Sequence, residues 1–341
     1  MGQPLKILAI QTKSLGDAVM LIPSLQAIRR HFPDAALHVA VPEVVAPLLQ
    51  REPSLTRLWP VPRVRGRATI RRNWPVIRAL RAERFDRSVD FAGNDRGAIL
   101  SFFCGARERL GILSKRGFLG RRFCFTRRIP PASPDRHETL RLLHILSAWG
   151  ITPQAPVDVQ LRADPSLDVS AAKLLPEGAI LCHIGTSLPK KEWPVESWAA
   201  FYRMATAAGY QLIFNAGAES REQALLRALK QSVPGIAALP ASLDLAMLLA
   251  VIKRARVCVS NDTGPMHFAA GLGVPTIGLF GPTSIVQWKP VGSQHQIIQG
   301  GHCNCSGTSH VCYCACHCMT GIQPKQVFGC LQKLVAPKQP Y

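Results

Sequence analysis

Short apolar runs of strand length alternate with stretches of helical periodicity along most of the chain, and this alternation restricts the fold more than any other feature. Residues 5–11 form the first apolar run, a polar loop follows, and residues 18–31 then show helical periodicity that stops before Pro33. Strands that alternate with single helices form parallel sheets. The sequence therefore predicts an α/β fold. The expected strands are 5–11, 37–41, 58–61, 87–91, 179–184, 210–215, 256–260 and 275–280, and the expected helices are 18–31, 43–50, 75–82, 135–149, 195–208, 220–231, 243–253 and 265–272.

The alternation is interrupted at residues 151–170, which contain three prolines and little periodicity. A chain of 341 residues also has the length of two domains rather than one. We therefore predict two doubly wound domains in series, residues 1–160 and 161–322. A helix and tail over 323–341 follow and can pack back on the first domain. Such domains bind ligands beyond the carboxyl ends of their strands, so the expected site is the cleft between them.

A polar loop joins the first predicted strand to the first predicted helix and contains Lys13, Ser14, Gly16 and Asp17. Gly16 permits a tight turn and the close approach of a ligand to the backbone. Asp17 stands where the helix begins. Its carboxylate is therefore either a first-turn acid that complements the helix dipole or a functional group, and the loop alone leaves both interpretations open.

A second polar loop, residues 183–194, follows the first strand of the second domain and contains Thr186, Ser187 and Lys191. Hydroxyl groups can donate hydrogen bonds to phosphate and an ammonium group can neutralise its charge, so this loop is a candidate phosphate cradle. The Walker A spacing is absent. The alternative is a polar loop that caps the next helix.

A third loop, residues 260–267, runs from a strand into a helix and includes Asp262. Pro265 suits the first turn of that helix. Backbone amides at such a helix start, those of Thr263 and Gly264, suit a diphosphate. His267 lies one turn into the helix, where its position alone fits a packed or capping residue as well as a functional one.

The formal net charge is +20, and most of the excess lies in the first 150 residues, where 26 lysines and arginines accompany 11 acidic residues. Such a surface attracts nucleic acid, anionic membrane or a phosphorylated glycolipid, unless it is simply a solvated face. Aromatic residues make up only 7% and no helix-turn-helix or zinc-finger spacing occurs, which argues against nucleic acid. The sequence patterns of the commonest hydrolases, metalloproteases and dehydrogenases are also absent.

Six cysteines and three histidines lie within residues 302–318. Thiolate and imidazole are suitable ligands for zinc or iron. The spacing is a repeated C-x-C rather than the C-x₂-C of most structural zinc sites. A metal site and reduced thiols in a surface loop therefore both remain open. The candidate ligands are Cys303, Cys305, Cys312, Cys314, Cys316 and Cys318.

Together these loops resemble glycosyltransferase family 9, the ADP-heptose:lipopolysaccharide heptosyltransferases. The resemblance rests on four segments in order: KILAIQTKSLGDAVMLIPSLQAIRRHFP, HIGTSLPKKEWPVESW, VSNDTGPMHFAAGLGVPTIGLFGPT and CMTGIQPKQV. The Asn-Asp-Thr-Gly-Pro-Met-His block is the most specific of them. Residues 60–135 match no motif, so the resemblance is weakest where acceptor contacts are expected.

The resemblance implies the GT-B fold, two Rossmann-like domains that face a central cleft, with the acceptor in the first and the donor mainly in the second. Asp17 resembles the family's catalytic carboxylate, a general base for a single inverting displacement. Lys191 would stabilise the leaving diphosphate, and Asp262 would hold sugar hydroxyls. Acceptor contacts are expected from Lys13, Ser14 and Gly16. Donor contacts are expected from Thr186, Ser187, Lys191, Glu219, Asp262, Thr263, Gly264 and His267.

The implied function is transfer of a heptose from ADP-heptose to the inner core of lipopolysaccharide, with a lipid A-core glycolipid as acceptor. The resemblance implies no required metal or cofactor. Because we find no signal peptide and no long apolar run, we expect a cytoplasmic protein, peripheral at the inner face of the inner membrane of a Gram-negative cell. The alternatives are a relative that uses another nucleotide sugar or a protein acceptor and, more remotely, a non-enzymatic polyanion-binding protein.

Overall fold

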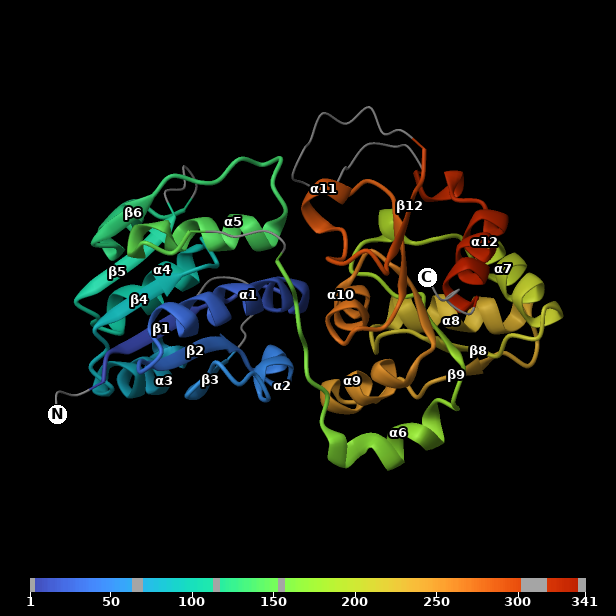
Figure 1. Cartoon of the computed structure of the whole chain (residues 1–341), viewed down its shortest axis with the longest axis horizontal. Helices are drawn as coiled ribbons and strands as arrows, with labels where there is room; N and C mark the ends of the chain where they lie inside the picture. Colours follow the sequence, from blue (N-terminus) through green and yellow to red (C-terminus); the bar gives the residue numbers. More distant parts are fainter. Residues whose placement is uncertain (1–3, 63–69, 113–116, 153–156, 302–317, 337–341) are drawn as a thin grey trace, which may run out of the picture. The chain divides into compact units, whose positions relative to one another are not determined.

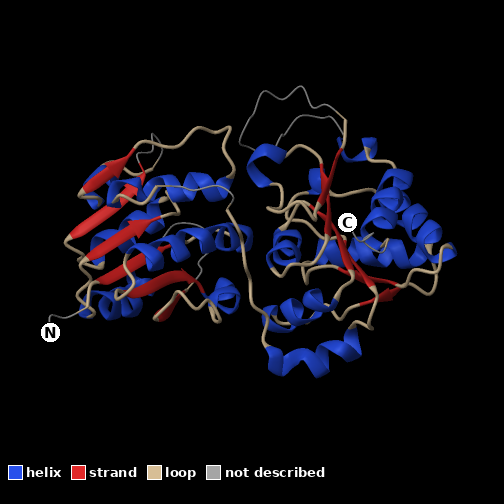
Figure 2. Ribbon diagram, viewed as in Figure 1, coloured by secondary structure: helices blue, strands red, loops and turns tan. Residues whose placement is uncertain are grey.

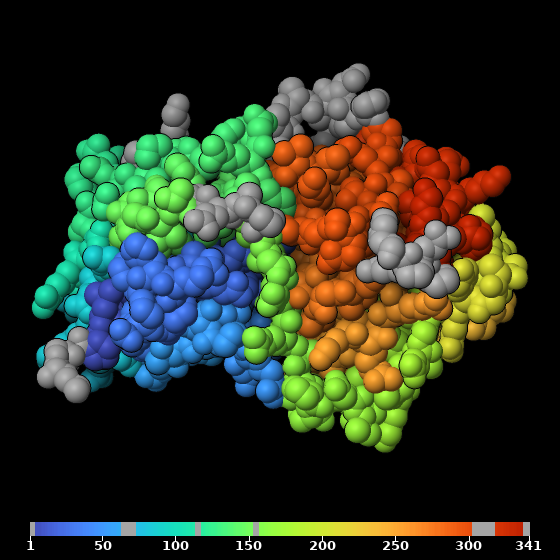
Figure 3. Space-filling view, in the orientation of Figure 1, coloured from blue at the N-terminus to red at the C-terminus, as the bar shows by residue number. Residues whose placement is uncertain are grey.

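The computed structural model describes residues 4–62, 70–112, 117–152, 157–301 and 318–336. The chain divides into two compact units, Met1–Leu161 and Arg162–Tyr341, each with its own sheet (Figures 1 and 2). Figure 3 shows one face of the molecule in space-filling form, coloured along the sequence. Within the described residues, no helix is both long and apolar enough to cross a bilayer.

The first unit contains a parallel sheet in the order β3-β2-β1-β4-β5-β6. The order reverses direction between β1 and β4, where the register pairs Ile10 with Asp90. This is the switch point of a doubly wound sheet, where ligands bind beyond the carboxyl ends of the strands. The strands are β1 Lys6–Ile10, β2 Ala36–Pro42, β3 Arg57–Val61, β4 Arg87–Asp90, β5 Glu108–Ile112 and β6 Arg127–Ile129.

Crossover connections join the parallel strands of this sheet, and such connections are almost always right-handed. Among the helices, α1 packs with α2 and α5, and α3 packs with α4, which in turn contacts η2. The elements are α1 Leu15–His31, η1 Glu43–Val45, α2 Ala46–Leu49, α3 Ile70–Ala82, α4 Asp95–Phe103, η2 Arg121–Cys124, α5 Glu138–Ile145 and η3 Leu146–Trp149.

Several expectations for the first unit need correction. The long helix expected over 135–149 begins only at Glu138 and ends in the 3-10 turn η3. The helix expected over 75–82 begins five residues earlier, at Ile70, so Pro75 lies inside it. Four elements of this unit, α4, β5, η2 and β6, were not predicted at all. Strand β6 has only three residues, two of them arginines, so its sequence carries little strand signal.

The second unit repeats the arrangement with a parallel sheet in the order β12-β11-β10-β7-β8-β9. Its direction reverses between β10 and β7, where Ser260 pairs with His183. The loops after these two adjacent strands therefore leave the same edge of the sheet. The strands are β7 Ile180–His183, β8 Leu212–Asn215, β9 Ala237–Ala238, β10 Val257–Asn261, β11 Thr276–Phe280 and β12 Gln296–Gln299.

On one face of the second sheet α7 packs with α8 and α12, while α9 packs with α6 and α10. The predicted linker 151–170 extends too far, because η4 and α6 begin within it. The elements are η4 Pro165–Leu167, α6 Asp168–Leu174, η5 Pro189–Lys191, α7 Val195–Ala207, α8 Ser220–Ser232, α9 Leu245–Arg254, α10 Gly264–Gly271, α11 Ile285–Trp288, η6 Cys318–Gly321 and α12 Pro324–Val335.

The last helix, α12, joins the core of the second unit, whereas the sequence left open that it packs back on the first domain. Val327, Leu331 and Val335 recur every four residues and form a buried stripe in the same cluster as Trp198. The indole of Trp193 also donates to the carbonyl of Ile322, just before α12 (3.0 Å). Burial of this stripe anchors α12 within the second unit.

Candidate functional site

The loop between β1 and α1 holds the carboxylate of Asp17 in a defined position. Asp17 lies in the first turn of α1 and is only 8% exposed. Its Oδ2 accepts hydrogen bonds from the Ser14 backbone N–H (3.2 Å) and from the Ser14 hydroxyl. The Lys13 ammonium lies 4.0 Å from Oδ1. Asp17 therefore has the first-turn role that its position suggested, and the same contacts fix its orientation.

A second carboxyl group, Asp90, ends the neighbouring strand β4 and was missed in the sequence. It is fully buried, and its Oδ1 accepts from the backbone N–H groups of Ala92 (3.0 Å) and Gly93 (3.4 Å). Burial raises the pKa of Asp90 to about 7, although the nearby positive charges of Arg121 and Lys13 favour the ionised form. A single aspartate at the end of an apolar run is the only signal that the sequence offered.

The loops after β1 and β4 are also tied together by side chains. The hydroxyl of Thr12 donates to Asn94 Oδ1 (2.9 Å), and the same oxygen accepts from the N–H of Gly97 in the first turn of α4. Gly97 has no side chain, and a Cβ there would collide with the Asp90 carboxylate. This edge of the first sheet therefore presents one connected polar surface around Asp17.

In the second unit the structure brings together two predicted residues that are far apart in the sequence. The Lys191 ammonium donates to Asp262 Oδ2 at 2.7 Å, and both side chains are largely buried. The loops that carry them are joined by Asn261, whose side-chain amide donates to the carbonyl of Ile184 (2.8 Å). The adjacent strands β7 and β10 thus present Lys191 and Asp262 as an ion pair at the carboxyl edge of the sheet.

The two predicted hydroxyl residues of the same loop differ in their surroundings. Thr186 is buried, and its Oγ1 accepts from the N–H of Leu188 (3.2 Å), whereas Ser187 is exposed. The sequence analysis missed Arg221, which donates to the carbonyl of Thr186 and pairs with Glu192. Arg221 thus fixes the backbone of the loop from α8, and no motif indicated it.

The N-terminus of α10 follows β10 directly and begins at the N-cap residue Thr263, with Gly264 as the first helical residue. The N–H groups of a first turn have no acceptor inside the helix and form a site for anions. His267 lies one turn later, is buried, and packs against Trp288 with ring centroids 6.4 Å apart. Because Thr263 follows Asp262 directly, these N–H groups lie next to the Lys191–Asp262 pair and form a candidate anion site with it.

Glu219, one of the expected donor contacts, is exposed at the N-cap of α8. A different carboxylate, that of Glu222, lies against the backbone at Gly185 and Gly217. It accepts from the Gly217 N–H (2.6 Å), and a Cβ at Gly185 or Gly217 would collide with it. Burial raises the pKa of Glu222. The Glu222 carboxylate can therefore occupy this position only because residues 185 and 217 are glycines.

His183, at the end of β7, is a buried neutral histidine. Burial lowers its pKa to about 4, and its Nδ1 accepts from the side-chain amide of Asn215 (3.0 Å). An imidazole with this pKa is uncharged near neutral pH. His183 therefore contributes no positive charge to the candidate anion site.

Of the six candidate cysteine ligands, only Cys318 lies within the described residues. Cys303, Cys305, Cys312, Cys314 and Cys316 lie outside the described residues. Cys318 is buried in η6. Across the described ranges, no group of three or more His, Cys, Asp or Glu side chains could hold a metal ion. The prediction of a metal site therefore stays a prediction.

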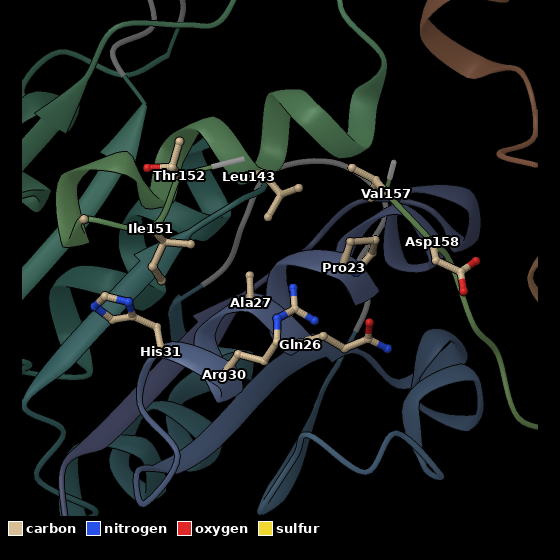
Figure 4. A pocket seen from close by; sticks show the side chains of 11 residues that line it. Pro23, Gln26, Ala27, Arg30, His31, Leu143, Ile151, Thr152, Val157 and Asp158 are labelled. Atoms are coloured by element: carbon tan, nitrogen blue, oxygen red, sulfur yellow. The ribbon is translucent and has the colours of Figure 1, made fainter. Parts of the chain in front are cut away.

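A pocket of about 450 Å³ lies in the first unit, away from the predicted site residues. Figure 4 shows Arg30, His31 and Asp158 around it. Its walls come from α1, α5 and the chain after η3, and none of the loops described above contributes to them. The pocket therefore gives no support to the predicted site.

Comparison with known proteins gives consistent results over most of the chain. The family model described as glycosyltransferase family 9 (heptosyltransferase) matches residues 73–315. Lipopolysaccharide heptosyltransferase 2 of Escherichia coli K12 is 26% identical over 308 residues, or 86% of this chain and 88% of that protein. Lipopolysaccharide heptosyltransferase 1 of Pseudomonas aeruginosa is 29% identical, covering 82% of this chain and 79% of that protein.

Solved structures match the fold over nearly the whole chain. The glycosyl transferase family 9 protein of Veillonella parvula has a TM-score of 0.84 at 19% identity and covers 98% of both chains. ADP-heptose lps heptosyltransferase II of E. coli has a TM-score of 0.78 at 22% identity, over 97% of this chain and 98% of that chain. With the two parallel sheets, these likenesses confirm the predicted GT-B fold of two Rossmann-like domains.

Proposed function

Because the chain belongs to glycosyltransferase family 9 (heptosyltransferase), we propose that it transfers a heptose from ADP-heptose to the inner core of lipopolysaccharide. The chain is a glycosyltransferase. The names of its relatives support the proposed substrates, since those proteins are lipopolysaccharide heptosyltransferases. The observation that carries the proposal within the structure is the Lys191–Asp262 pair beside the N-terminus of α10.

On the donor side, we assign the diphosphate to the N-terminus of α10, where the amides of Thr263 and Gly264 donate to it. Lys191 neutralises the charge that grows on the diphosphate as the glycosidic bond breaks. Asp262 fixes the Lys191 ammonium and also accepts from hydroxyls of the sugar. The further donor contacts are assigned to Thr186, Ser187, His267 and Glu219.

On the acceptor side, Asp17 acts as general base, while Lys13, Ser14 and Gly16 contact the acceptor. An acceptor hydroxyl oxygen attacks the anomeric carbon of the donor sugar and passes its proton to Asp17. The bond from the anomeric carbon to the diphosphate breaks in the same step, and ADP leaves with the electron pair. One displacement inverts the configuration of the anomeric carbon. The hydrogen bonds from Ser14 support this role because they hold the carboxylate in one orientation.

In this proposal ADP-heptose enters as a substrate, and the reaction requires no bound metal or cofactor. The acceptor is a lipid A-core glycolipid. The protein meets it as a cytoplasmic enzyme that associates peripherally with the inner face of the inner membrane. The strongly basic first 150 residues support contact with anionic lipid.

The experiment measures donor binding and turnover by the wild type and Asp17→Asn with ADP-heptose, UDP-sugars and GDP-sugars. We expect turnover with ADP-heptose, and a loss of about 10² or more in kcat for Asp17→Asn with donor affinity unchanged, because a general base contributes about that factor. Asp34→Asn, an exposed aspartate in the same unit, serves as the matched control and should keep full activity.

Other outcomes would change the proposal in defined ways. Turnover with a different nucleotide sugar, or onto a protein acceptor, would retain the mechanism and replace the substrate. Equal kcat for the wild type and Asp17→Asn would remove Asp17 as the base. If no nucleotide sugar binds, the proposed function is wrong.

A further inference from the structure

Large apolar side chains are exposed along α4 and the segment 117–124 that follows β5. Leu119 is fully exposed, and Phe123 is 65% exposed. Phe118 and Phe102 are exposed by 40% and 46%. Gly120, with a φ of +91°, turns the chain directly after Leu119. Single exposed apolar residues are common on proteins, but several in one region indicate a contact surface.

These residues belong to one continuous surface because hydrogen bonds hold the segment against α4. The backbone N–H of Phe118 donates to Asp95 Oδ1 at the start of the helix (3.3 Å). Near its end, Arg109 donates to the carbonyl of Cys124 (2.8 Å) and lies 5.7 Å from the ring centroid of Phe102. One end of the segment is thus hydrogen-bonded to α4, the other end is hydrogen-bonded to β5 beside Phe102, and η2 packs on α4 between them. We call Phe102, Phe118, Leu119 and Phe123 the α4 apolar surface.

Arginine side chains lie directly beside the aromatic rings of this surface. The Arg122 guanidinium is 4.8 Å from the ring centroid of Phe123, and Arg109 has the similar position beside Phe102. The acidic side chain of α4, Asp95, forms an ion pair with Arg121, whose Nε lies 3.9 Å from Oδ1, so its negative charge is compensated. Aromatic and aliphatic side chains interleaved with arginine match the boundary between headgroups and acyl chains in a bilayer that carries anionic lipid.

The α4 apolar surface begins at the edge of the sheet that carries Asp17. Helix α4 follows β4, and its N-cap residue Asn94 accepts a hydrogen bond from Thr12 in the β1–α1 loop. A surface that rests on a membrane here keeps the Asp17 loop near the headgroups, where the sugar of a lipid-anchored acceptor lies.

We propose that the α4 apolar surface, with Arg109 and Arg122, docks the first unit on a bilayer of anionic phospholipid. This inference rests on the proposed function in one respect: the proposed function explains why the protein would dock, namely to reach a membrane-bound acceptor. The docking itself follows from the exposed side chains and their charge. Leu119 and Phe123 enter the acyl boundary, while the Arg122 guanidinium binds lipid phosphate. Arg109, which donates to the carbonyls of Ala106 and Cys124, holds the segment in place and adds positive charge.

The experiment is cosedimentation of the full chain with vesicles of phosphatidylethanolamine and phosphatidylglycerol, compared with vesicles of phosphatidylcholine alone. We expect the wild type to prefer the anionic vesicles, and the double variant Leu119→Ser/Phe123→Ser to partition at least tenfold more weakly. Arg122→Gln should weaken binding to the anionic vesicles and leave binding to phosphatidylcholine unchanged. Val169→Ser, which changes a 74% exposed valine on α6, is the matched control and should bind as the wild type does.

Wild-type partition by the double variant, or equal partition of the wild type into both vesicle types, would overturn the proposal. A change of oligomeric state in the double variant without loss of vesicle binding would assign the surface to a second copy of the chain and also overturn it. Binding of ADP and the melting temperature verify that the variants are folded. An activity assay with a delipidated, water-soluble acceptor separates the two proposals. If neither the wild type nor any variant glycosylates this acceptor, the proposed function fails. The docking surface still stands in that case, provided that vesicle binding depends on Leu119 and Phe123.

Discussion

Replacement of Asp90 by asparagine should remove a large pH dependence of the stability of the first unit. Burial raises the pKa of this carboxyl from 3.8 to about 7. A folded-state pKa above the unfolded value means that the folded protein binds the proton more tightly. The resulting stabilisation is fully present below about pH 4 and is lost as the pH rises through about 7. A shift of about 3 units corresponds to about 4 kcal/mol of free energy of unfolding.

The variant preserves the local geometry, because the side-chain oxygen of asparagine can still accept from the N–H groups of Ala92 and Gly93. Thermal unfolding of wild type and variant at about pH 5 and about pH 8 measures the effect. Between these values the wild type should lose about 2–3 kcal/mol through Asp90. For a unit of this size that loss lowers the melting temperature by roughly 5–10 °C. The Asp90→Asn variant should show no such loss.

The difference between the two proteins isolates Asp90 from the other titrating groups. His183 has the opposite effect on the free energy of unfolding. Because its pKa is lowered to about 4 in the folded protein, its contribution to stability increases as the pH rises. His183 is present in both proteins, so its contribution cancels. Parallel melting temperatures of wild type and variant across the range would refute the assignment of a protonated, buried Asp90.

Two further predictions concern the second unit. Lys191→Met should weaken ADP binding, measured by calorimetry, by about tenfold to a hundredfold, because charge-assisted hydrogen bonds contribute about 1.5–3 kcal/mol; an equal effect of the neighbouring Lys190→Met would contradict a specific role of Lys191. Trp198→Ala should lower the free energy of unfolding by about 3–5 kcal/mol in urea titrations, because this buried indole packs against Trp193 with ring centroids 4.8 Å apart. Val286→Ala, at an exposed valine of the same unit, should change it by about 0.5 kcal/mol or less, and similar effects of the two changes would argue against the packing.

The predicted strands and helices are confirmed where the hydrophobic periodicity continues over many residues without interruption. The helix expected from residue 18 exists as α1, and the strand expected over 256–260 exists as β10. One group of missed elements lies between residues 95 and 129, where arginines interrupt the apolar pattern, and a second group consists of short elements of the second unit such as β9, α11 and β12. Strand β6 exists because β5 supplies a pairing partner, and such a partner is visible only in the folded sheet.

The loops of the candidate site were located correctly in the sense that they leave the carboxyl edges of adjacent strands. Chain order alone places a loop after a strand, and the topology of a doubly wound sheet then determines which edge it occupies. The pairing of Lys191 with Asp262, 71 residues apart, required the register of β7 against β10. Glu222 was missed for a related reason, since its approach to Gly185 and Gly217 depends on how α8 packs.

The sequence by itself determined the α/β class, the division into two domains and the three polar loops, because periodicity and turn residues act over a few neighbouring positions. The tertiary structure alone decided which carboxyl is buried, which lysine meets which aspartate and which aromatic side chains stay exposed. Asp90 and Asp17 are both single acidic residues next to apolar runs, yet Asp90 becomes fully buried, which raises its pKa to about 7, whereas Asp17 stays 8% exposed. The burial of a side chain and its contacts depend on residues far away in the sequence, and they are established only when the sheets and helices have packed.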